Sequence, residues 1–141
     1  MIICGVELTG SDAVVCLLHL EHGQFLVPDC RVRKVTLKKG HTREDLQQFQ
    51  FSFAKLMSDY SVDKVVIRER MPKGKFAGGA ISFKLEAAIQ LIAELDVELF
   101  SAAQIKTALA ENPLPVPFAE TGLKVFQEPA FTVAYAAHML K

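Results

Sequence analysis

Short apolar runs alternate with turn residues over the N-terminal part of the chain. Residues 2–8 and 13–20 are rich in Ile, Val and Leu, and a turn segment that contains Gly follows each of them. A third run lies within residues 24–37, and Pro28 is the place where such a strand would bend. Strands that follow one another through tight turns form an antiparallel meander, so we expect three antiparallel strands here.

The spacing of apolar residues becomes helical after this meander. Apolar side chains recur at helical spacing between Leu46 and Met57, which predicts a helix over residues 42–60 with Thr42 as its N-cap. Residues 63–69 are apolar at the centre of a short run, which is typical of a buried inner strand. The same reasoning predicts, in chain order, a helix over 80–95, a strand over 97–100, a helix that begins at 101, and a closing helix over 130–140.

This order of elements predicts an α/β fold with a mixed five-stranded sheet. Three antiparallel strands come first, two further strands add to the sheet in parallel, and helices cover both faces. The chain has 141 residues, half of them hydrophobic, so we expect one domain over residues 1–141. Lys and Arg together equal Asp and Glu at 16 each, which argues against a surface that contacts nucleic acid over its whole extent but permits a local basic patch.

The sequence gives no sign of export or of a membrane partner. The N-terminus lacks a basic start and a cleavage site, and no run approaches the length of a membrane-spanning helix. Cys4, Cys16 and Cys30 are widely spaced and lack the paired spacing of metal ligands. We therefore expect a cytoplasmic protein with reduced cysteines.

Three carboxylates lie at the ends of predicted elements. Glu7 ends the first strand, Glu69 ends the strand over 63–69, and Glu128 precedes the last helix. The two strands are expected to be parallel neighbours, so their carboxyl ends meet at the crevice where open α/β sheets bind ligands. Carboxylates held close together repel one another, and a divalent cation relieves this repulsion. Such a cluster with Mg²⁺ or Mn²⁺ can activate water and bind a phosphate that is being cleaved.

Each of these residues also has a structural interpretation. Glu7 would form a salt bridge with Arg68 or Arg70 inside an apolar strand. Glu69 would be a solvated strand end beside the same two arginines. Glu128 would stabilise the first turn of the last helix through the helix dipole. The sequence leaves these alternatives open.

Several segments, taken in order, resemble the ribonuclease H-like superfamily and, within it, the RuvC-type Holliday-junction resolvases. The first resembles their opening Gly-x-Asp-x-Gly-Ser strand, and the others resemble their second acidic strand end, the loop and long helix that follow, a helix start and the final acidic helix. These segments are 5–11, 66–69, 73–76 with 84–88, 102–106 and 128–136.

The resemblance implies a ribonuclease H-like, three-layer α/β/α fold and metal-dependent cleavage of nucleic-acid phosphodiesters, in a bacterial branch of the superfamily. It implies catalytic and metal-binding roles for Glu7, Glu69 and Glu128, with Mg²⁺ or Mn²⁺ as the cofactor. It also implies a homodimer, since these resolvases pair to cut two strands. The helix over 80–95 agrees with this, because it has more Ala and Ile than one buried stripe needs.

Four lysines are the candidate nucleic-acid contacts. Lys73 and Lys75 lie beside glycines in the loop before the helix over 80–95, where they either meet a phosphate or are simply solvated. Lys84 and Lys106 lie in the segments that resemble the resolvase helices, and the resemblance implies the same role for them.

The chain also departs from the resolvase pattern. Glu7 and Glu128 stand where the family has Asp, Phe131 stands in place of a fourth acid, and the nearly uncharged residues 112–117 replace a basic stretch. Two hypotheses follow. One is a RuvC-like, metal-dependent nuclease, and the other is a catalytically degenerate ribonuclease H-like protein that works as a binding or assembly module.

Overall fold

The computed structural model describes residues 1–71 and 79–140. These residues form a six-stranded mixed sheet in the order β3-β2-β1-β5-β6, with β4 also paired to β2. β1 is antiparallel to β2 and parallel to β5, and β6 continues the sheet in parallel to β5. The strands are β1 (Ile2–Thr9), β2 (Asp12–Glu21), β3 (Gln24–Leu26), β4 (Lys34–Thr36), β5 (Lys64–Arg68) and β6 (Val97–Phe100).

The third predicted strand is two strands in the structure. β3 and β4 pair with opposite ends of β2, and residues 27–33 connect them outside the sheet. Pro28 lies in this connection and lacks the N–H that a continuous strand would need. The backbone N–H of Val15 instead donates to the carbonyl of Arg33 at 2.9 Å. The predicted mixed sheet is therefore confirmed, with one strand more than expected.

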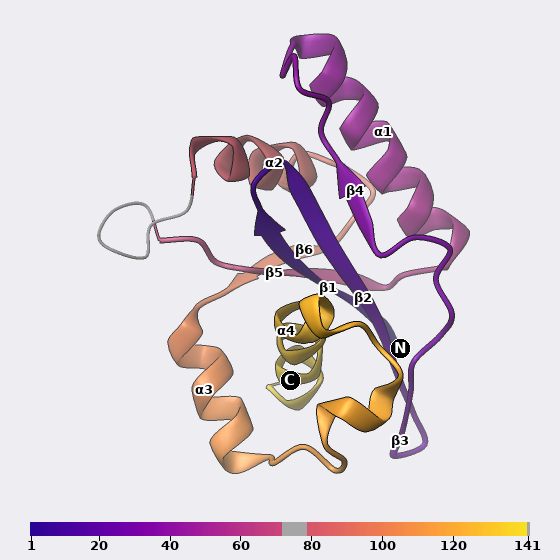
Figure 1. Cartoon of the computed structure of the whole chain (residues 1–141). Coiled ribbons are helices and arrows are strands. Elements are labelled where there is room, and N and C mark those ends of the chain that lie inside the picture. Colours follow the sequence, from indigo (N-terminus) through magenta and orange to yellow (C-terminus); the bar gives the residue numbers. More distant parts are fainter. Residues whose placement is uncertain (72–78, 141) are drawn as a thin grey trace.

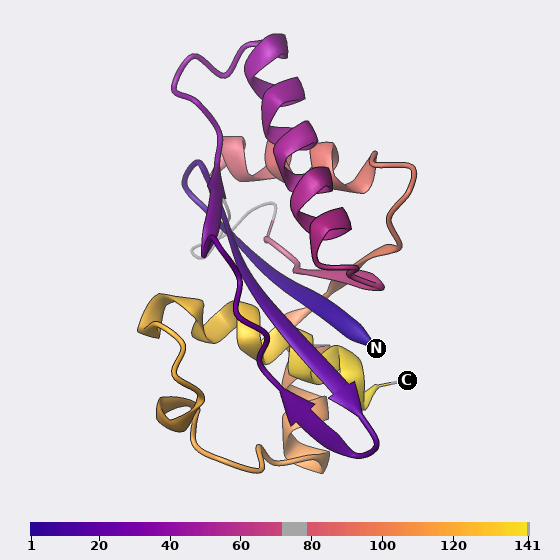
Figure 2. The same ribbon diagram turned by 90° about the vertical axis from the view of Figure 1, so that its right-hand side faces the viewer.

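Helices cover both faces of this sheet. Figures 1 and 2 show α1 and α2 on one face, with α4 on the other face and α3 beside it. No helix among the described residues is long and apolar enough to cross a membrane. The helices are α1 (Arg43–Asp59), α2 (Ala80–Gln90), α3 (Ala102–Glu111) and α4 (Glu128–Met139), with short 3₁₀ helices at Phe118–Thr121 and Val125–Gln127.

Local signals explain where the helices begin. Thr42 caps α1 in a capping box with Asp45, and Ser101 caps α3 in a capping box with Gln104. α4 begins at residue 128, two residues before its predicted start, because a proline at position 129 fits the first turn of a helix. α2 ends at residue 90, whereas the apolar pattern predicted a helix to residue 95.

The alternation of side chains along the strands divides the core into two layers. In β1, one set of residues packs against α1 and α2, and the other set faces α4. The α1–α2 layer includes Cys4, Val6, Leu8, Phe49, Phe53, Ile67 and Leu85. The α4 layer includes Ile3, Val66, Ala130, Phe131 and Ala134.

α4 approaches the sheet closely at Gly5. A Cβ at this position would lie 1.9 Å from the carbonyl oxygen of Ala130, so only glycine lets the helix pack here. The side-chain amide of Gln127 donates to the carbonyl of Val15 in β2 at 3.0 Å. Since Val15 pairs with Val6, the start of α4 is held beside the C-terminal half of β1.

Candidate functional site

The candidate site lies at the C-terminal ends of β1, β5 and β6, and its centre is a pair of opposite charges. Val6 pairs with Ile67 in the parallel register, so the next residues, Glu7 and Arg68, are neighbours. Val6 and Ile67 belong to the α1–α2 layer, and alternation therefore turns Glu7 and Arg68 toward α4. Arg68 Nη1 lies 3.8 Å from Glu7 Oε2. The predicted salt bridge of Glu7 is thus present in the structure.

The two partners differ in their access to water. The Glu7 side chain is 18% exposed, whereas the Arg68 side chain is 41% exposed. Burial raises the pKa of Glu7, and the charges of Arg68 and Arg70 lower it but offset only part of this effect. Glu7 is therefore a carboxylate whose charge is incompletely stabilised.

Glu128 lies on the same side of the sheet as this pair. It is the first residue of α4, and it lines a cavity of about 240 Å³ together with Arg68 and Thr132. Arg68 therefore forms an ion pair with one predicted site residue and shares a cavity with another.

Glu69 belongs to the other side of the sheet. Its backbone N–H donates to the carbonyl of Phe100 at 2.8 Å, so the strand geometry continues and its side chain points away from the α4 face. Burial raises the pKa of Glu86 in α2, and the charge of Glu69 raises it to a smaller extent. The Glu86 Oε2 atom is buried and makes no hydrogen bond with the described part of the chain. Sequence reasoning missed Glu86, and its position in an apolar helix was the available signal.

The residues at this edge do not fit the metal centre that the carboxylates suggested. Residues 1–71 and 79–140 contain no group of three or more His, Cys, Asp or Glu side chains that could hold a metal ion. Arg68, a cation, is the β5 residue beside Glu7. Phe131 is 6% exposed and packs edge-on against Phe118 with ring centroids 5.6 Å apart, so the place of the fourth acid is hydrophobic core.

A second cavity adjoins the pair and is suited to an anion. It measures about 800 Å³, and Arg68 and Arg70 line it together with Glu69 and with Ala102 and Ala103 at the start of α3, so two guanidinium groups face one carboxylate. Figure 1 shows that β5 and β6 both end on the side of the sheet where α3 begins. The Arg70 Nε atom is buried without a hydrogen-bond partner among the described residues. The first amides of a helix also lack partners within the helix and attract negative groups.

The predicted lysine contacts are only partly described. Lys84 lies exposed on α2 and Lys106 lies exposed on α3, so both are free to meet a large ligand. Lys73 and Lys75 lie outside the described residues. The sequence suggested Arg68 and Arg70 only as salt-bridge partners of acidic residues. Their shared cavity could not be predicted from the sequence, because it depends on the register of β5 and on the position of α3.

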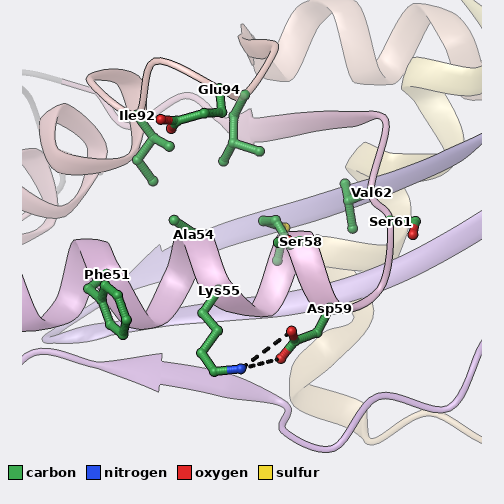
Figure 3. Close-up of a pocket in the computed structure, with 11 residues that line it drawn as sticks. Phe51, Ala54, Lys55, Ser58, Asp59, Ser61, Val62, Ile92 and Glu94 are labelled. Atoms are coloured by element: carbon green, nitrogen blue, oxygen red, sulfur yellow. Dashed lines mark hydrogen bonds and ion pairs between the residues drawn. The ribbon is translucent and has the colours of Figure 1, made fainter.

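A different kind of hollow lies on the opposite face of the sheet. It measures about 660 Å³ and lies between α1 and the residues that follow α2 (Figure 3). Phe51 on its rim is 68% exposed, and Leu91 in the adjoining hollow is 75% exposed. Exposed apolar side chains of this size suit a protein contact better than a phosphate.

Comparison with solved structures confirms the ribonuclease H-like fold. The Thermus thermophilus RuvC structure matches with a TM-score of 0.74 and 14% identity, over 99% of this chain and 94% of that chain. T. thermophilus RuvC in complex with Holliday junction substrate matches with a TM-score of 0.68 and 12% identity, over 99% and 94% of the two chains. Fowlpox virus resolvase with Holliday junction DNA matches with a TM-score of 0.55 and 12% identity, over the full length of both. Identities this low establish the fold alone.

The sequence itself matches one family model. The family described as "Protein of unknown function (DUF3010)" matches residues 1–137. No curated protein matches the chain.

Proposed function

Because the chain belongs to the DUF3010 family and has the fold of RuvC, we propose that it binds the phosphodiester backbone of nucleic acid at the C-terminal ends of β1, β5 and β6. The observation that carries this proposal is the cavity lined by Arg68, Arg70 and the start of α3. Guanidinium groups bind phosphate oxygens through paired hydrogen bonds, and a helix N-terminus adds amide donors.

The exposed lysines extend this site in the proposal. Lys106 lies on α3, which borders the cavity, and Lys84 lies on α2 across the sheet edge. Lys73 and Lys75 belong to the segment between β5 and α2. A local basic path of this kind is compatible with a chain of zero net charge.

Binding to labelled DNA tests the proposal. Fluorescence anisotropy would compare a four-way junction, a duplex and a single strand for the wild type and for an Arg68→Gln/Arg70→Gln variant. We expect the variant to bind at least about tenfold more weakly, because charge-assisted contacts to phosphate are lost. Lys39→Gln/Arg43→Gln is the matched control, since it removes the same charge and both residues are exposed near the start of α1. Equal affinity of the wild type and the double variant would contradict the proposed site.

The second candidate function is a nuclease that uses Mg²⁺ or Mn²⁺. The place of Glu7 and Glu128 on the same side of the sheet favours it, whereas Arg68 would have to turn away from Glu7 and Glu69 would have to leave the side of Glu86. The test is cleavage of a four-way junction, single-stranded DNA and an RNA–DNA hybrid with each metal. Cleavage by the wild type and none by Glu7→Gln would support a nuclease. Equal traces in both proteins would indicate contamination, and no cleavage would leave binding as the function.

The proposal includes a homodimer and a cytoplasmic location. Phe51 and Leu91 give α1 and the end of α2 an exposed apolar surface that a second copy would cover. Sedimentation of the wild type should show a dimer, and Phe51→Glu should shift it to a monomer, whereas Phe126→Glu at another exposed phenylalanine should not. A monomeric wild type at micromolar concentration would refute the dimer. The cytoplasmic location rests on Cys4, Cys16 and Cys30, which are free in the structure.

A further inference from the structure

A positive side chain lies among the carboxylates of the α4 face. Arg68 pairs with Glu7 at 3.8 Å, and it lines a cavity together with Glu128. Arg70 lines the adjoining cavity and adds a second positive group. A metal-binding carboxylate cluster would instead keep its negative charges for the ion.

A divalent cation is disfavoured at this place. An ion between Glu7 and Glu128 would lie near the Arg68 guanidinium, and like charges at short range repel strongly where burial limits screening. Arg68 would have to turn away before such an ion could bind.

Arg68 keeps donors for a ligand. Its contact with Glu7 at 3.8 Å is longer than a hydrogen bond of good geometry, which ends at about 3.2 Å. Its side chain is 41% exposed and lines both cavities. A phosphate that approaches from solvent can therefore bind the guanidinium through two hydrogen bonds, which Glu7 does not make.

We propose that Arg68 takes the place of a divalent cation in this crevice, so that the chain binds nucleic-acid phosphate without a metal and Glu7 weakens this binding by competing for Arg68. This inference rests on the proposed function, and it makes Glu7 a residue that lowers affinity. The incomplete stabilisation of the Glu7 charge agrees with it, because the Arg68 contact offsets only part of the cost of burial.

The experiment measures binding of a labelled four-way junction by anisotropy, with EDTA or with Mg²⁺ or Mn²⁺. The proteins are the wild type, Glu7→Gln and Arg68→Gln, with Glu44→Gln and Arg43→Gln as controls of equal charge change. Glu44 and Arg43 are exposed in the first turn of α1. Circular dichroism and thermal melts of each variant verify that it is folded.

We expect the wild type to bind in EDTA at least as tightly as in Mg²⁺, because a divalent cation competes with the arginines for the phosphates. Glu7→Gln should bind about 1.5- to fivefold more tightly, the range for release of a partly exposed ion pair. Arg68→Gln should bind at least about tenfold more weakly. The control variants should change affinity by less than about twofold, because charges remote from the site are screened.

The outcomes separate this inference from the function on which it rests. Binding that requires a metal and is lost in Glu7→Gln would overturn the inference and leave nucleic-acid binding intact. An unchanged or weaker affinity of folded Glu7→Gln in EDTA would overturn the competition between Glu7 and phosphate. Failure of the wild type to bind DNA in any buffer would overturn both.

Discussion

Arg68, the last residue of β5, and Glu69, which follows it, face different surroundings on the two sides of the sheet. On the α4 side, Arg68 meets Glu7 at 3.8 Å, and opposite charges lie together. On the α2 side, Glu69 lies near Glu86, and like charges together with burial raise the pKa of Glu86. The first arrangement offers guanidinium donors to an anion, and the second repels one. A single step along the chain therefore leads from the surface suited to phosphate to its acidic border, because Glu69 also lines the cavity of Arg68 and Arg70.

The largest expected effect comes from placing a charge in the core of the α4 side. Phe131 is 6% exposed and packs against Phe118. Phe131→Asp should lower the free energy of unfolding by at least about 4 kcal/mol, because it leaves a cavity and buries a carboxylate. Urea denaturation measures this loss. Phe126→Asp at a 47% exposed phenylalanine is the control, with an expected change within about 0.5 kcal/mol. A stable Phe131→Asp protein that binds Mn²⁺ would show that the α4 side can form a metal site.

The next effect tests the packing that holds α4 over the site. Gly5→Ala would place a Cβ 1.9 Å from the carbonyl oxygen of Ala130, so the helix must shift. We expect a loss of about 3 kcal/mol in the free energy of unfolding, the upper range for overpacking. Gly79→Ala is the matched control, because an added Cβ there meets no atom within 4 Å. Equal unfolding midpoints for the two variants would mean that the close approach at Gly5 is unimportant.

The raised pKa of Glu86, which burial and then the nearby Glu69 charge cause, should appear in the pH dependence of stability. The pKa of Glu86 is raised above its usual 4.5, so the folded chain binds a proton more tightly than the unfolded chain. Stability therefore falls as the pH rises from 4.5 through the raised pKa, and the loss is complete above it. Glu86→Gln removes this loss and should gain less than about 1 kcal/mol over the wild type at neutral pH and nothing below the usual pKa.

Urea midpoints measured from about pH 4 to pH 7 test the titration of Glu86. Glu94→Gln is the control, since Glu94 is exposed on the same side of the sheet. A constant difference between the wild type and Glu86→Gln over this range would contradict a raised pKa of Glu86.

The same contrast shows how far the sequence could lead. The apolar pattern predicted the mixed sheet and the helices on both faces, because strand and helix periodicities are local properties. It also placed Glu7 at the end of a strand beside the end of β5. It did not distinguish Arg68 from Glu69 as the neighbour of Glu7, since a shift of one residue in register moves every side chain of a strand to the other face. Arg70 and the start of α3 are distant in the sequence but line one cavity, so no local sequence pattern predicts this cavity.

The smallest expected effect concerns the contribution of the Arg68–Glu7 pair to stability. Arg68 is 41% exposed, and the charged atoms are 3.8 Å apart, so solvent weakens their attraction. A double-mutant cycle of Glu7→Gln and Arg68→Gln should give a coupling energy of about 0.5 kcal/mol in urea denaturation. High salt should reduce this value further through screening. The same Arg68→Gln change is expected to weaken DNA binding at least about tenfold, which would identify Arg68 as a ligand-binding residue with a minor structural role. A coupling energy above about 2 kcal/mol would instead indicate a tight structural ion pair, and Arg68 would then have no donors to offer a phosphate.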